Sequence, residues 1–197
     1  MKSRRLKVVA GFVLILLAGY SGVTLWKNAG ASVPQELSDA RVQGAIISES
    51  IVGLSAKSAA DLDKINQLDK ERKYAEALKL TADVIDQSRE IRDKAVALSE
   101  QIGIMTKSLS GVNSLEARQA LLDGITSRLA LVSRLINYSA YLSQLLDVLR
   151  DHFDGVSFKE GDVAHLVDQV NSEVSAINSF NEQATQSMEK FDKILGK

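Results

Sequence analysis

Four consecutive segments of the chain repeat apolar residues at alternating spacings of three and four residues. This spacing places the apolar side chains on one face of an α-helix, because the helix has about 3.6 residues per turn. Aromatic residues make up only 5% of the 197 residues, and there is one proline. A sheet protein would contain more aromatic and β-branched residues. The pattern therefore predicts an all-α fold built from long helices.

Each segment has its own predicted core stripe. The stripes of the first, second and fourth segments run through 37–68, 74–109 and 163–195. The third segment is richer in apolar residues, and its stripe shifts partway along the helix. The residues predicted to form its core are Leu122, Ile125, Leu129, Val132 and Ile136, followed by Leu135, Tyr138, Leu142, Leu145 and Leu149.

Residues that favour helix ends separate the segments. Three pairs have the spacing of a capping box, namely Ser32 with Gln35, Asn113 with Glu116, and Ser157 with Glu160. Gly111 and Gly155 stand where a helix end favours a positive φ. The predicted helices lie near 33–68, 73–109, 114–152 and 158–195. Equal lengths with short connections predict an up-down-up-down antiparallel four-helix bundle. The alternative is a pair of long helical hairpins that pack loosely or dimerise.

An uncharged run of 19 residues, 8–26, precedes the bundle. A helix of that length approaches the roughly 30 Å of bilayer hydrocarbon, so the run predicts an N-terminal transmembrane helix that acts as a signal anchor. The predicted contact with the lipid bilayer is made by Val8, Phe12, Leu14, Ile15, Leu16, Leu17 and Trp26. The predicted organisation is a basic tip at 1–7, this helix, a linker at 27–32 and the bundle at 33–197.

The charges around this run predict its orientation. Lys2, Arg4, Arg5 and Lys7 precede it, and Lys27 alone follows it. The positive-inside rule then predicts a single-pass protein of the cell membrane, with a cytoplasmic N-terminus and an extracytoplasmic C-terminal domain. The alternative is a signal peptide cleaved after Ala31, which would release the exported domain.

Composition argues against several functions. Residues 33–197 contain 19 of the 24 basic residues and all 25 acidic ones, so we expect no nucleic-acid binding. Without cysteine there is no disulfide or thiolate chemistry. No hydrolase elbow, phosphate-binding loop or metalloprotease motif occurs. We therefore expect no enzyme, no cofactor and no bound metal.

The predicted bundle gathers two aromatic residues and several cations at one end. They are Lys70, Arg72, Lys73, His152, Phe153 and Phe158. One interpretation is a docking patch for a partner in the cell envelope or for an anionic ligand. The other is that the aromatic residues close the end of the core while the cations are solvated.

Small or polar residues interrupt the predicted core stripes. They are Gly44, Ser58, Thr81, Ser88, Ser139 and Asn181. Such residues either line a cavity or fix the register of neighbouring helices. Two functions are therefore expected as alternatives. The first is a structural or protein-interaction role in the cell envelope, with or without oligomerisation. The second is the binding or sensing of a small ligand between the helices.

Overall fold

The computed structural model describes residues 33–156 and 160–196, and this part of the chain is all-helical, without strands. Its elements are α1 (Gln35–Lys70), α2 (Tyr74–Lys107), the short 3-10 helix η3 (Ser108–Gly111), α3 (Leu115–Phe153) and α4 (Glu160–Ile194). The ends of the four long helices differ from the predicted ends by two residues or fewer.

The predicted transmembrane helix at 8–26 lies outside the described residues, as do the capping residues Ser32 and Ser157. Within the described residues, no helix has the length and apolar character needed to cross a membrane.

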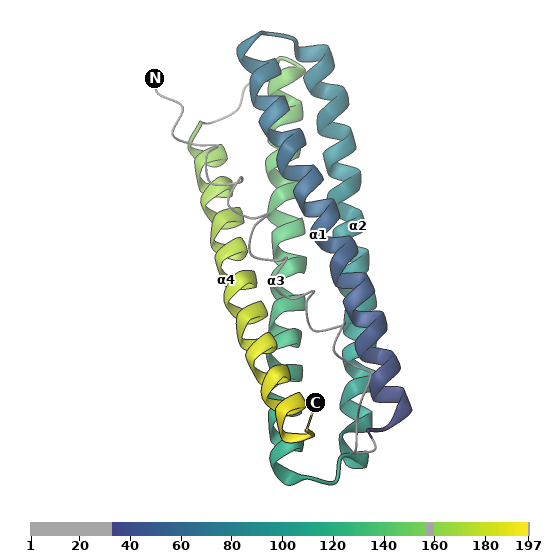
Figure 1. Ribbon diagram of the computed structural model, residues 1–197. Helices are drawn as coiled ribbons and strands as arrows, with labels where there is room; N and C mark the ends of the chain where they lie inside the picture. The colour runs from purple at the N-terminus through teal and green to yellow at the C-terminus, as the bar shows by residue number, and fades with distance from the viewer. Residues whose placement is uncertain (1–32, 157–159, 197) are drawn as a thin grey trace.

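The four long helices form a bundle in which consecutive helices run in opposite directions (Figure 1). Close backbone packing joins α1 to α2, α2 to α3 and α3 to α4, whereas α1 and α4 approach each other far less. We call the end that holds the α1–α2 turn and the end of α3 the distal end. The start of α1, the α2–α3 connection and the end of α4 lie together at the opposite, proximal end (Figure 1).

The loop at the proximal end is held against the start of α1. A Cβ atom on Gly111 would lie 2.6 Å from Cγ of Pro34, so only glycine fits there. The backbone of Gly111 does not have the positive φ that we predicted, whereas Gly155 does, with φ 80°. The predicted cap of the third helix was displaced by one residue. Ser114, not Asn113, caps α3, and its side chain accepts a hydrogen bond from the Ala117 N–H over 3.2 Å.

The core runs the length of the bundle and consists mainly of aliphatic residues. In α2 the predicted stripe is buried from Ala77 to Met105, while Tyr74 at its start is exposed. In α3 the prediction was partly wrong, because three residues assigned to the core are exposed. They are Leu122, Leu129 and Ile136, with exposed fractions of 42%, 47% and 36%.

Polar residues on the stripes hold helices in register. Gly44, Ser58, Thr81, Ser88 and Ser139 are buried, and Asn181 is half-buried. Ser139 Oγ donates to the backbone oxygen of Ser88 over 2.6 Å, and Ser88 Oγ lies 3.0 Å from the backbone oxygen of Ser139. Ser58 Oγ donates to Gln87 Oε1 over 2.7 Å. Since each bond is made only at one alignment, the pairs fix α2 against α3 and α1 against α2.

The α1–α2 turn places an arginine where most helices have glycine. Arg72 has φ 58°, in the left-handed region, and the N–H of Lys73 donates to the Leu68 carbonyl over 2.9 Å. A helix commonly ends with a left-handed residue in this position, and glycine is preferred because it lacks a Cβ.

Replacing Arg72 with glycine should therefore raise the free energy of unfolding by about 0.5–1 kcal/mol, because the left-handed backbone is no longer opposed by a Cβ. Urea denaturation followed by circular dichroism measures the change. Arg72→Ala is the control, since it removes the guanidinium but keeps the Cβ. An equal gain from alanine would mean that the side chain, not the backbone conformation, is the cause.

Tyr138 of α3 is buried, and burial raises its pKa to about 12. Between pH 10 and 12 the unfolded chain therefore loses this proton while the folded chain keeps it, so stability falls as the pH rises through this window. Absorbance titration at alkaline pH should show that one tyrosine ionises last, near pH 12. The variant Tyr138→Phe should lack that phase and lose less stability over the same pH range. A wild-type protein without a late phase would contradict the prediction.

Candidate functional site

The distal end contains most of the predicted docking patch. Phe153 is buried beneath Tyr74, with ring centroids 6.0 Å apart and planes at 25°. His152 lies edge-on to Tyr74 at 6.1 Å, and its Nε2 is 3.3 Å from Oδ1 of Asp69. Phe158 lies outside the described residues. Phe153 therefore closes the end of the core, and Tyr74, which we did not include in the patch, covers it.

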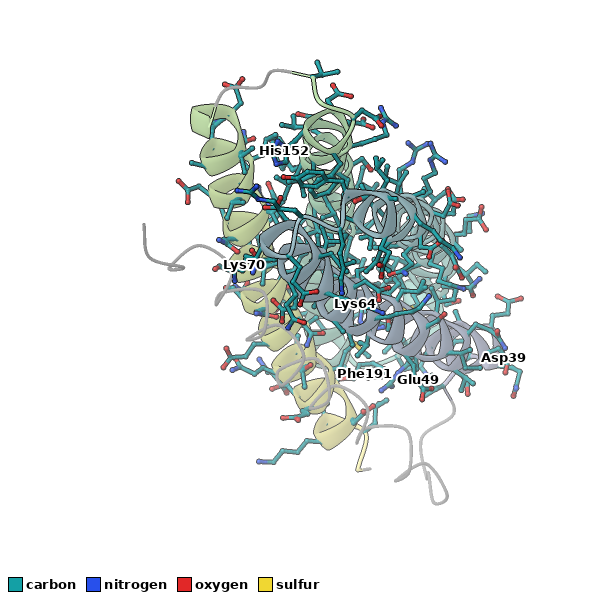
Figure 2. The ribbon with its side chains drawn as sticks, turned by 90° about the horizontal axis from the view of Figure 1, so that it is seen from above. Asp39, Glu49, Lys64, Lys70, His152 and Phe191 are labelled. Carbon is teal, nitrogen blue, oxygen red and sulfur yellow. The ribbon has the colours of Figure 1, made fainter. Side chains whose placement is uncertain are left out.

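The cations of the distal end are interspersed with acids. Lys70, Arg72 and Lys73 are exposed, and Figure 2 shows Lys70 and His152 at neighbouring helix ends. Lys73 Nζ lies 2.7 Å from Glu71 Oε2, and this hydrogen bond, followed by the charges of Glu71 and Glu76, raises the pKa of Lys73. Residues 69–73 and 150–154 together contain four acidic and four basic residues besides His152. The distal end thus has no excess of positive charge to attract an anion.

A different exposed surface lies on α3. Four large aliphatic side chains follow one another at intervals of seven residues along this helix. Their exposed fractions are 78% for Leu115, 42% for Leu122, 47% for Leu129 and 36% for Ile136. We call these four residues the α3 stripe. Residues seven apart lie on nearly the same side of a helix, so the stripe is continuous over about 32 Å.

Uncharged residues border the α3 stripe from Leu129 onward, whereas the exposed residues Glu116 and Asp123 stand beside Leu115 and Leu122. A second exposed row stands four residues after each stripe residue and consists of Gln119, Thr126, Ser133 and Ala140. No acidic residue occurs between Asp123 and Asp147. The outer side of α1 is different, since Asp39, Glu49 and Lys64 project from it (Figure 2). Exposed apolar residues with few charges around them are typical of a surface that binds another protein.

The two arginines in this part of α3 belong to other contacts. Arg134 lies 3.4 Å from Glu173 of α4. Nη1 of Arg128 is 3.9 Å from the position that a Cβ atom would take on Gly44 of α1. Both guanidinium groups therefore extend toward neighbouring helices, which leaves the stripe without charged neighbours between Gly124 and Leu146.

A group of charges joins α1 and α4 near the proximal end. Arg41 donates two hydrogen bonds to the carboxylate of Asp192, over 2.7 and 2.8 Å. Its guanidinium also lies 5.5 Å from the ring centroid of Phe191, which is buried. These contacts hold the Arg41 side chain in one orientation and link two helices whose backbones remain apart.

Arg128 adds a second cation to this group. Burial, and to a smaller extent the nearby charge of Arg41, lower its pKa to about 10, while Asp192 opposes the shift. Asp192 uses both oxygens on Arg41, so two guanidinium groups share one carboxylate. The space between α1, α3 and α4 therefore brings two guanidinium groups close to the carboxylate of Asp192.

Three further polar atoms on α1 and α4 are buried without a hydrogen-bond partner among the described residues. They are Ser55 Oγ, Glu173 Oε2 and Asn178 Oδ1. Buried polar atoms usually find a partner, so these mark places where a water molecule or a small polar ligand would complete the bonding. Across the described ranges, no group of three acidic or histidine residues is arranged to hold a metal ion.

No protein-family model, curated protein or solved structure matches the chain. Function therefore has to be inferred from the geometry of these surfaces.

Proposed function

We propose that the protein is a membrane-tethered helical bundle with a non-enzymatic, structural or protein-interaction role in the cell envelope. Residues 8–26 would anchor it in the cell membrane, and residues 33–197 would lie outside the cytoplasm. The α3 stripe is the observation that carries the proposal. It leaves four large aliphatic side chains in contact with water along one helix face with few charges, and a protein partner would remove them from water.

A photoreactive amino acid at Thr126, in the uncharged row beside the stripe, tests the interaction in intact cells. We expect irradiation to yield covalent adducts with protein, because Thr126 is exposed between Leu122 and Leu129. The matched control is the same amino acid at Gln43, which is exposed on α1. Equal yields of adducts from the two positions, or none from either, would count against the proposed role.

Protease treatment of intact cells tests the proposed location. We expect the protease to remove residues 33–197 from a protein that otherwise stays with the membrane, because the basic residues before the apolar run favour a cytoplasmic N-terminus. Full protection until the membrane is broken would contradict the orientation. Release of the intact domain without protease would favour cleavage after Ala31.

The second candidate function is the binding or sensing of a small ligand between the helices. The two neighbouring guanidinium groups of Arg41 and Arg128 support it, since guanidinium groups bind carboxylates and phosphates. Thermal unfolding of the full chain with a panel of small carboxylates and phosphates tests it. We expect an increase in melting temperature that Arg128→Met abolishes. No increase with any compound, in a bundle whose interior is dry, would exclude this function.

A further inference from the structure

We infer that the α3 stripe binds a second copy of this chain, with the two α3 helices parallel and side by side. This inference rests on the proposed function, because it names the partner of the same surface. Four observations support it: the spacing of the stripe, the residues beside it, the charge of the rest of the domain, and the direction in which tethered copies must point.

The spacing of the stripe suits a pair of identical helices. Two helices that wind around each other bring together residues repeated every seven positions, in which one row is typically leucine. Leu115, Leu122, Leu129 and Ile136 would form that row, and the smaller residues at Gln119, Thr126, Ser133 and Ala140 would form the other. Polar residues in the second row fix the register of a coiled coil while weakening it. A helix with this repeat is complementary to its own copy.

The charge of the domain favours this face for self-association. Residues 33–197 carry 25 acidic and 19 basic residues, so two copies repel each other over most of their surfaces. The stretch from Gly124 to Leu146 has no acidic residue, and its two arginines turn toward α1 and α4. Along this stretch, which contains Leu129 and Ile136 of the stripe, two copies can therefore meet without placing like charges in contact. A partner of strong charge would find no opposite charge here to pair with.

Tethering would set the relative direction of the two helices. Copies that enter the same membrane from the same side have their α3 helices pointing the same way. In a parallel pair each stripe residue meets the same residue of the partner, whereas in an antiparallel pair centred on Leu129, Leu122 would meet Ile136. The two arrangements thus differ in which residues are close to their own copies.

The absence of native cysteine makes this difference measurable in the full chain in its membrane. The single variants Leu122→Cys, Leu129→Cys and Ile136→Cys would be oxidised and separated by mass under non-reducing conditions. We expect all three to give covalent dimers of the chain. The control is Ile46→Cys, which replaces an aliphatic residue that is 55% exposed on α1, and it should give at least 10-fold less dimer.

Dimers from Leu129→Cys alone, with a mixed dimer between Leu122→Cys and Ile136→Cys, would overturn the parallel arrangement. Stripe yields equal to the Ile46→Cys yield would overturn self-association. A charged residue provides a second test, because Leu122→Glu in the Ile136→Cys chain places two carboxylates face to face. It should reduce the dimer yield at least 10-fold without loss of helical circular dichroism, and an unchanged yield would also contradict the inference.

The outcomes separate this inference from the proposed function. If Thr126 forms adducts with another protein while the stripe cysteines give no dimer, the stripe binds a different partner and only the inference fails. If the stripe gives neither adducts nor dimers, both fail. If the adducts of Thr126 consist of two copies of this chain, both are supported.

Discussion

Replacing Asp192 with alanine should lower the free energy of unfolding by about 2–4 kcal/mol, because removing one partner of a buried ion pair leaves an uncompensated charge. The side chains of Arg41 and Asp192 are 13% and 23% exposed, so most of the pair is shielded from water. Asp192 accepts two hydrogen bonds from Arg41, and its charge also acts on Arg128, so its removal takes a carboxylate from both guanidinium groups. Chemical denaturation of the wild type and the variant measures the loss.

Arg128→Met is the matched second change. It removes the second cation of the group but retains an apolar stem in the bundle, so we expect the wild-type protein to tolerate it or become more stable. In the Asp192→Ala chain the same change should restore part of the lost stability, which gives a coupling energy of at least about 0.5 kcal/mol. A loss of less than about 0.5 kcal/mol on removing Asp192 would show that the pair behaves as an exposed one.

Where apolar residues occupy a single face, the sequence was sufficient to predict the helices and their core. In α2 the periodic stripe from Ala77 to Met105 is also the buried face. The all-helical bundle and the positions of its turns follow from four such stripes and the polar residues between them. The α1–α2 turn lies between the two predicted helices although residues 69–73 contain no glycine or proline. Arg72 in this turn has the left-handed backbone conformation.

In α3, periodicity was insufficient because apolar residues lie on more than one face. Both Leu121 and Leu122 fit a spacing of three and four, yet Leu121 is buried and Leu122 is exposed. Which of two adjacent leucines faces the core depends on where α2 and α4 pack, and that is a tertiary property. The exposed residues then form the α3 stripe, which the sequence could suggest only as an excess of leucine on one helix.

The charged group at Arg41 could not be predicted for a related reason. Its members lie on three helices and are separated by as many as 151 positions in the chain. Each arginine is adjacent to a residue of a predicted core stripe, Ala40 or Leu129, in a pattern that also fits a solvated helix edge. Only the position of the Arg128 side chain near Gly44 of α1 shows that Arg128 is turned inward. The distal docking patch stays a prediction, and its cations alternate with acids along the chain.

Two leucines of α3 test the division of this helix into a buried and an exposed face. Leu142 is fully buried, so Leu142→Ala should lower the free energy of unfolding by about 2–5 kcal/mol, the usual range for a cavity left in a core. Leu129→Ala makes the same chemical change at an exposed position. At concentrations low enough for the chain to be monomeric, Leu129→Ala should lower the free energy of unfolding by less than about 0.5 kcal/mol. Urea denaturation of the two variants gives both values.

The two leucine variants also distinguish a leucine that stabilises the core from one that binds a partner. A small cost at Leu129 in the monomer, together with loss of self-association in the same variant, would show that Leu129 serves the surface and not the core. A cost at Leu129 as large as that at Leu142 would instead place it in the interior, and the α3 stripe would then have no free face. Leu129→Ala should therefore weaken association without lowering the stability of the monomer, whereas Leu142→Ala should lower both. The reason is that Leu129, but not Leu142, is in contact with water in the folded monomer.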